Sequence, residues 1–290
     1  LDGQCRRPLS RLAHPDWRTA RQRLTPFPRL VIDLSGKTAL VTGASGHLGR
    51  AIALALCDAG ASVLINSRSA ERCDALVSDL RERGHQAEPA VFDVTSTEDV
   101  ARFLQTLSGA ALDVVVNNAH QGAAGTIATS NEKEFQAAFD IAVTAAHRLI
   151  LHSLPNLRRA VAERGDASII NIASMYGLVS PDLRNYDTPQ VSNPPFYGAA
   201  KAGLMQLTRY AACEFGHEGI RCNALAPGPF PSDRVQGEDP AFVERLAARV
   251  PLGRIGRAEE IGGPVVFLAS PSATFINGAV LPVDGGWTAW

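Results

Sequence analysis

The stretch "TALVTGASGHLGRAIALALCDAG" (38–60) decides the fold. It begins with a short apolar run, continues through Gly43, Gly46 and Gly49 at intervals of three, and ends in a helical pattern. At a strand-to-helix turn, glycines allow the backbone to approach a pyrophosphate, and the helix N-terminus offers free N–H groups. The stretch therefore predicts a dinucleotide-binding turn, with an ordinary strand-to-helix turn as the alternative.

The remainder of the chain alternates short apolar runs with amphipathic stretches. Apolar runs without polar alternation are typical of strands buried on both faces, and helical patterns between them supply parallel crossovers. We count seven such strands and no linker or repeat. The pattern predicts an α/β fold, a doubly wound seven-stranded parallel sheet of the Rossmann type with helices on both faces, formed by one catalytic domain over residues 31–290.

Composition excludes several classes of function. The chain has 290 residues, a hydrophobic content of 46% and a formal net charge of −1, which does not favour binding to nucleic acid. No apolar run has the length of a membrane span. The five cysteines show no CxxC pairing, so neither a metal site nor a disulfide scaffold is expected. We predict a cytoplasmic protein with a small-molecule substrate and no membrane or nucleic-acid partner.

Residues 1–30 differ from the average composition. They contain seven arginines against two aspartates. Such a segment can be a targeting peptide, a partner-binding arm or a poorly ordered extension. We predict an Arg-rich N-terminal extension that is separate from the catalytic domain.

The second predicted strand ends in "INSR" (65–68). An enzyme that selects NAD usually places an acidic residue here, on the ribose 2′-hydroxyl. Asn66 and Ser67 are neutral, and Arg68 is a cation whose planar donors suit a 2′-phosphate. The stretch favours NADP (NADPH) over NAD, and an exposed loop arginine is the alternative.

Several motifs in order resemble the short-chain dehydrogenase/reductase family, over residues 34–287. They are "TGASGHLG" (42–49), "NNA" (117–119), Ser174 in "NIASMYG", Tyr197 and Lys201 in "YGAAK", "NALAPG" (223–228) and "LPVDGG" (281–286). The later motifs are similar to those of the compact branch of the family. The resemblance implies hydride transfer between a nicotinamide and a carbonyl or secondary alcohol.

Tyr197 and Lys201 are four residues apart and share one face of a helix. A nearby ammonium lowers the pKa of a phenol, so we expect Tyr197 to exchange a proton with a substrate oxygen near neutral pH. The resemblance implies that Tyr197 is the acid/base, that Ser174 orients the substrate oxygen, and that Lys201 tunes Tyr197 and holds the nicotinamide ribose.

The resemblance also implies a set of cofactor contacts. The expected residues are Gly43, Ser45, Gly46, His47, Leu48, Gly49, Ser67, Arg68, Asp93, Val94, Asn117, Ala119, Tyr197, Lys201, Pro227, Gly228 and Ser232. Among these, Asp93 is expected at the adenine, Asn117 at the ribose and Ser232 at the carboxamide. The expected substrate contacts are His120, Tyr176 and Phe230. A homotetramer, or a homodimer, is implied as well.

The chain departs from the family pattern at three places. His47 stands where the compact branch usually has glycine, and Ala142 stands where the family commonly has an asparagine of a proton relay. An insertion at 178–196 lies between Ser174 and Tyr197 and must emerge beside the active site. Its residues Arg184, Asn185, Tyr186 and Asn193 would suit a polar, sugar-like or acidic substrate, unless the insertion is an inert surface excursion.

These features predict an NADP-dependent oxidoreductase acting on a carbonyl or secondary alcohol, and they favour a polar or sugar-derived substrate. The alternative is a cofactor-binding regulatory protein on the same fold without turnover. The missing asparagine is the reason to consider this alternative, and the intact Ser174, Tyr197 and Lys201 argue against it.

Overall fold

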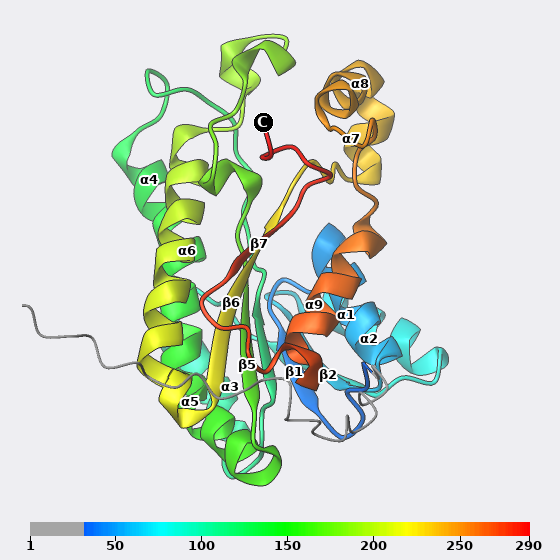
Figure 1. The fold of residues 1–290 in the computed structure, drawn as a ribbon, viewed down its shortest axis with the longest axis vertical. Helices are drawn as coiled ribbons and strands as arrows, with labels where there is room; N and C mark the ends of the chain where they lie inside the picture. The colour runs from blue at the N-terminus through cyan, green and yellow to red at the C-terminus, as the bar shows by residue number, and fades with distance from the viewer. Residues whose placement is uncertain (1–31) are drawn as a thin grey trace, which may run out of the picture. The chain divides into compact units, whose positions relative to one another are not determined.

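The computed structural model describes residues 32–290, which contain a seven-stranded parallel sheet in the order β3-β2-β1-β4-β5-β6-β7 (Figure 1). The strands are β1 (Thr38–Val41), β2 (Ser62–Ser67), β3 (Ala87–Val91), β4 (Val114–Asn117), β5 (Ala167–Ile172), β6 (Ile220–Pro227) and β7 (Val280–Val283). The predicted doubly wound fold is confirmed. The Arg-rich extension at 1–30 lies outside the described residues, so its separation from the domain stays a prediction.

Helices cover both faces of the sheet (Figure 1). They are α1 (His47–Asp58), α2 (Ala70–Glu82), α3 (Thr97–Thr106), α4 (Glu132–Phe139), α5 (Ala145–Arg164), α6 (Pro195–Phe215), α7 (Asp233–Glu238), α8 (Pro240–Arg249) and α9 (Gly262–Ala269). Side chains of α1, α2 and α9 form one buried apolar cluster with the sheet, and those of α3, α5 and α6 form another. Burial on both sides explains the unbroken apolar runs of the central strands.

The site is positioned by the reversal of strand order at β1. This strand pairs in parallel with β2 on one side and with β4 on the other. The helices that follow β1 and β4 therefore leave in opposite directions, and a crevice opens at the carboxyl ends of the two strands. The glycine turn that follows β1 lies at this crevice.

The helical segment that begins after Asn131 is interrupted. Asn131 begins α4 with a capping box, in which its side chain accepts hydrogen bonds from Lys133 N and Glu134 N while the Glu134 carboxylate accepts from Asn131 N. A π-helical turn, Asp140–Thr144, then separates α4 from α5. Such turns insert one extra residue into a helix and are frequent at functional sites.

In the described part of the chain, no helix is both long enough and apolar enough to cross a membrane.

Cys57, Cys73 and Cys222 are buried free thiols, and Cys213 is an exposed one. Burial raises the pKa of Cys57 and of Cys222 to about 12, so both thiols stay protonated and fill space in the core.

Candidate active site

A cavity of about 850 Å³ occupies the crevice at the carboxyl ends of the strands. The expected cofactor-site residues that line it are Gly43, Ser45, Gly46, His47, Leu48, Gly49, Ser67, Arg68, Asp93, Val94, Ala119, Tyr197, Lys201, Pro227, Gly228 and Ser232. They come from the carboxyl ends of β1, β2, β3, β4 and β6, or the segments that follow them, and from α6. The tertiary structure thus brings together residues separated by as many as 189 positions, from Gly43 to Ser232.

The glycine turn is packed too closely for side chains. Gly43 has a φ of 60°, in the left-handed region that glycine favours. A Cβ at Gly49 would lie 2.2 Å from the Gly43 carbonyl oxygen and 2.8 Å from Nδ2 of Asn118. At Gly49 the first turn of α1 therefore lacks a side chain and packs directly against the Gly43–Ala44 backbone, as a pyrophosphate cradle requires.

Asn117 is the expected cofactor residue that does not line this cavity. Its side chain is buried, and Nδ2 donates a hydrogen bond to Oδ1 of Asn171 at 2.8 Å. Asn118 lines the cavity instead, where its Nδ2 donates to the carbonyl oxygens of Thr42 (2.9 Å) and Gly43 (3.2 Å). Consecutive strand residues point in opposite directions, so the two asparagines cannot serve the same site. Applying this alternation to "NNA" would have identified Asn118.

Strand β2 ends at the part of the cavity that Arg68 lines. Asn66 is buried; its Oδ1 accepts from Gly43 N at 3.3 Å and its Nδ2 donates to the Ala90 carbonyl at 2.9 Å. Ser45 and Ser67 place their hydroxyl oxygens 3.2 Å apart. The Arg68 side chain is 71% exposed, and Arg72 in the first turn of α2, which the sequence analysis missed, lines the same cavity. The available signal was a second cation close to Arg68 in the sequence.

The three expected catalytic residues meet at one point of the cavity. Ser174 follows β5, and its hydroxyl oxygen accepts a hydrogen bond from Tyr176 N at 3.1 Å. Tyr197 and Lys201 extend from α6, with Nζ of Lys201 5.8 Å from the centroid of the Tyr197 ring. The ammonium donates to the Ile172 carbonyl oxygen at 2.7 Å, which fixes its position beside β5.

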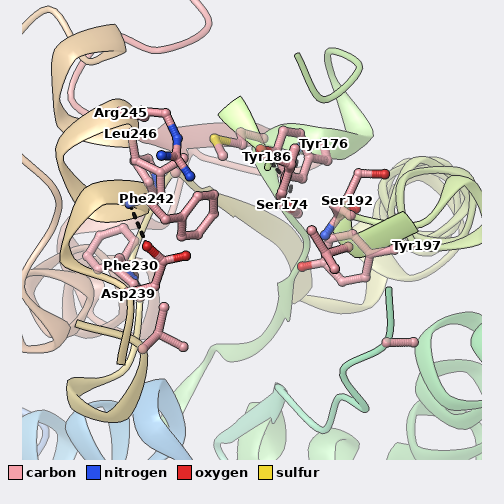
Figure 2. Close-up of a pocket in the computed structure, with 18 of the residues that line it drawn as sticks. Ser174, Tyr176, Tyr186, Ser192, Tyr197, Phe230, Asp239, Phe242, Arg245 and Leu246 are labelled. Atoms are coloured by element: carbon pink, nitrogen blue, oxygen red, sulfur yellow. Dashed lines mark hydrogen bonds between the residues drawn. The ribbon is translucent and has the colours of Figure 1, made fainter. Parts of the chain in front are cut away.

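A second cavity, of about 540 Å³, adjoins the first and shares Ser174, Tyr197, His120 and Phe230 with it (Figure 2). All three expected substrate contacts, His120, Tyr176 and Phe230, line this second cavity. The insertion forms part of its wall through Tyr186, Asp187, Val191, Ser192 and Asn193. Helices α7 and α8 supply the facing wall, and we call this space the substrate cavity.

Two insertion residues expected at the substrate do not line the substrate cavity. Arg184 is exposed and pairs with Asp182, its Nη2 2.7 Å from Oδ2. Asn185 is buried, and its carbonyl oxygen accepts a hydrogen bond from Nε of Arg245 on α8. Both residues lie in a short 3-10 turn, Leu183–Asn185, whose N-cap is Asp182. The Asp182 cap was recognisable in the sequence, but the position of Arg184 and Asn185 outside the cavity was not.

The chain matches, over residues 43–288, a family model described as "Enoyl-(Acyl carrier protein) reductase". It belongs to the short-chain dehydrogenase/reductase family. It is 36% identical over 259 residues to the rhamnolipids biosynthesis 3-oxoacyl-[acyl-carrier-protein] reductase of Pseudomonas aeruginosa, covering 88% of this chain and 97% of that one. It is 33% identical over 263 residues to the gluconate 5-dehydrogenase of Gluconobacter oxydans, covering 89% and 97%.

A solved structure agrees with this assignment. The gluconate 5-dehydrogenase from Burkholderia cenocepacia, in complex with NADP and tartrate, superimposes with a TM-score of 0.79 at 30% identity, over 90% of this chain and 98% of that one. As a short-chain dehydrogenase/reductase, the protein is an NAD(P)-dependent oxidoreductase that acts on a small molecule. The order of motifs in the sequence had indicated this family correctly.

Burial determines the protonation of the catalytic groups in this short-chain dehydrogenase/reductase. It raises the pKa of Tyr197, while the Ser174 hydroxyl acts in the opposite direction, and it lowers the pKa of Lys201 to about 8. The expectation that Lys201 brings the phenol pKa toward neutrality is therefore wrong for this structure. Desolvation disfavours the phenolate, and the pKa rises even though the Lys201 ammonium lies close to the ring. Tyr197 is a protonated phenol at neutral pH, ready to donate.

His120 is the other titratable group where the two cavities meet. Its ring packs edge-on against Tyr197, with centroids 5.0 Å apart. Burial, and secondly the charge of Lys201, lower the pKa of His120 to about 4. The imidazole is thus neutral at pH 7 and offers one donor and one acceptor beside Tyr197.

Ala142 lies in the π-helical turn and borders a small cavity beside Lys201. The space measures about 10 Å³ and is also lined by Asn117 and Thr42. That is close to the volume that a single water requires. Ala142 itself contributes no polar side-chain atom where the family commonly has asparagine.

Proposed function

We propose that this enzyme uses NADP to interconvert a carbonyl and a secondary alcohol on a polar or sugar-derived substrate. The observation that carries the proposal is the meeting of Ser174, Tyr197 and Lys201 where the cofactor and substrate cavities join. When bound, NADP supplies or accepts the hydride. The protein contributes position and proton transfer.

Each catalytic side chain has a distinct task in this proposal. Tyr197, protonated at neutral pH, donates its proton to the carbonyl oxygen as the alcohol forms. Ser174 orients that oxygen with its hydroxyl. Lys201 uses one of its three N–H donors on Ile172, which leaves two for the nicotinamide ribose.

The cofactor would lie along the first cavity. Backbone groups from Gly43 to Gly49 would hold the pyrophosphate, with His47 beside it. Asp93 and Val94 would border the adenine, and Pro227, Gly228 and Ser232 the nicotinamide. The close packing at Gly49 supports this fit, because bare backbone there leaves the helix N-terminus accessible.

A polar substrate is supported by the hydroxyl and amide groups of Tyr176, Tyr186, Ser192 and Asn193. Relatives named as gluconate 5-dehydrogenases support the sugar-derived class. The test is a screen of NADPH and NADH oxidation at about 340 nm against ketoses, keto acids, diketones and acyl thioesters. Tight NADPH binding without turnover of any of these would instead favour the regulatory alternative.

Cofactor choice is expected to depend on Arg68. Replacing it with Asp should weaken NADP binding by about 1–3 kcal/mol, because charge-assisted hydrogen bonds to the 2′-phosphate are lost. Fluorescence titration with NADPH and NADH measures the effect. Arg83→Asp is the matched control, since Arg83 is the C-cap of α2, pairs with Asp79 and lies outside the cavity. An unchanged preference in Arg68→Asp would contradict NADP selection.

The rate of reduction is expected to decline as pH rises through about 8. Lys201 has a lowered pKa of about 8, so it is an ammonium below that pH and loses its charge above it. The profile of kcat/KM against pH should show this alkaline limb. Lys201→Arg, whose guanidinium stays charged, should shift the limb to higher pH even if its rate is lower. A limb at the same pH in Lys201→Arg would assign it to another group.

We also infer assembly into a closed homotetramer or homodimer. Large apolar side chains are exposed on α4, α5 and α6, at Phe139, Leu151 and Tyr210, and Trp290 is exposed at the C-terminus. Light scattering at micromolar concentration should give a multiple of the 30.8 kDa chain mass. A stable monomer would contradict this inference. The cytoplasmic location predicted from composition likewise stays a prediction.

A further inference from the structure

The two walls of the substrate cavity are joined by Arg245 of α8. Its Nε donates to the Asn185 carbonyl oxygen at 2.8 Å, and its Nη2 donates to Oδ1 of Asp187 at 2.8 Å. The guanidinium lies over the Phe242 ring, 5.9 Å from its centroid. In Figure 2, Arg245 projects from the helix toward Tyr186, across the cavity from Tyr197. Two oxygen atoms of the insertion thus accept hydrogen bonds from one edge of the planar guanidinium group.

The charges of this cavity do not favour an anion. Within residues 32–290, Arg245 is the one lysine or arginine that lines it, and two carboxylates, Asp187 and Asp239, line it as well. Asp239 begins α8 and accepts a hydrogen bond from Phe242 N at 2.9 Å. Lys201 lines the cofactor cavity and not this one. The neighbouring imidazole of His120 adds no charge at neutral pH.

The other lining groups are neutral. Met175, Val191, Phe230, Val235 and Leu246 are apolar, and the hydroxyls of Tyr176 and Tyr186 lie 3.2 Å apart. A carboxylate that entered would lose hydration and meet two like charges, with its natural partner Arg245 already paired. A hydroxyl or hydroxymethyl group carries no such cost.

Further contacts hold the segment around Asp187 against α8. Tyr186 packs against Phe242 with ring centroids 5.4 Å apart, and Arg249 pairs with Asp182 at 2.5 Å. The insertion is also tied to the loop after β4, since Gly125 N donates to the Ser192 carbonyl at 3.0 Å. The Arg245–Asp187 pair therefore joins two walls that neighbouring contacts also hold together.

We propose that Asp187 is the built-in partner of Arg245, and that the substrate cavity therefore selects uncharged carbonyl or alcohol substrates over the corresponding carboxylates. This inference rests on the proposed function and narrows its substrate class. Asp187 and Arg245 act as specificity-determining residues. The insertion thus contributes to recognition through its charge as well as its shape.

The experiment compares matched substrate pairs that differ in one charge. With NADP, d-glucitol is compared with d-gluconate; with NADPH, 4-(hydroxymethyl)cyclohexanone is compared with 4-oxocyclohexanecarboxylate, within a wider panel of such pairs. The wild-type enzyme is expected to favour the neutral member by at least about tenfold in kcat/KM. Asp187→Asn, which frees Arg245, should reduce that preference about tenfold, mainly by lowering KM for the acid.

Two further variants complete the design. Glu238→Gln removes the same charge from α7, where the residue is 60% exposed, pairs with Arg234 and lies outside the cavity. It is expected to keep the wild-type preference. Arg245→Gln in the Asp187→Asn background should abolish the gain for acids, because the freed cation is then absent. Asp187 is 70% exposed, so its replacement should leave the fold intact, which circular dichroism can verify.

The outcomes separate the two proposals. Equal or better use of the acids by the wild-type enzyme would overturn the charge preference and leave the proposed activity standing. The charge preference would also be overturned if Asp187→Asn and Glu238→Gln favoured neutral over acidic substrates to the same extent. If the wild-type enzyme binds NADPH but converts neither member of any pair, the proposed function fails and the preference fails with it.

Discussion

Tyr197→Phe is expected to lower kcat for carbonyl reduction by about 10²–10⁴-fold. The change removes the hydroxyl that donates the proton and keeps the ring that packs against His120. NADPH affinity should change little, because the glycine turn and Arg68 are untouched. Initial rates of NADPH oxidation, together with a fluorescence titration of NADPH, measure the two quantities separately.

Tyr210→Phe is the matched control for this variant. Tyr210 lies on the same helix, α6, and is 67% exposed, outside both cavities. It should retain the wild-type rate. If Tyr197→Phe were to keep more than about a tenth of kcat, the proton donor would have to be another group at the junction, and His120 would be the first candidate.

Gly49→Ala is expected to disable the cofactor cavity. The new Cβ would lie 2.2 Å from the Gly43 carbonyl oxygen and 2.9 Å from Cα of Ala44, so the backbone of the turn must move. Overpacking of this kind costs about 1–3 kcal/mol of stability. A displaced turn should also lower kcat/KM by about a hundredfold, because the backbone donors no longer face the pyrophosphate. Thermal unfolding and NADPH titration report the two effects.

Gly263→Ala provides the comparison within another helix. Gly263 lies in α9, and a Cβ there would meet no atom within 4 Å. Alanine favours the helix over glycine by about 1 kcal/mol, so the midpoint of unfolding should rise or stay constant. If Gly49→Ala bound NADPH with wild-type affinity, the turn would tolerate displacement, and close packing at Gly49 would not be needed for cofactor binding.

Local patterns in the sequence were sufficient to predict the architecture. Uninterrupted apolar runs such as "TALV" and "DVVVN" indicate strands buried on both faces, and the amphipathic segments between them require parallel crossovers. The order β3-β2-β1-β4-β5-β6-β7 then places the strand ends together. The family motifs are short segments at those same ends, so the catalytic residues could be named from sequence as well.

Properties that depend on direction and environment were decided only by the tertiary structure. Whether Asn117 or Asn118 faces the cavity depends on the pleat of β4, and the pairing of Asp187 with Arg245 joins residues 58 positions apart. Burial raises the pKa of Tyr197 even though Lys201 lies four residues away. Desolvation depends on all surrounding atoms, and these come from segments distant in the chain. The sequence by itself determined the fold and the chemical groups of the site, and the packing decided their orientation, protonation and charge balance.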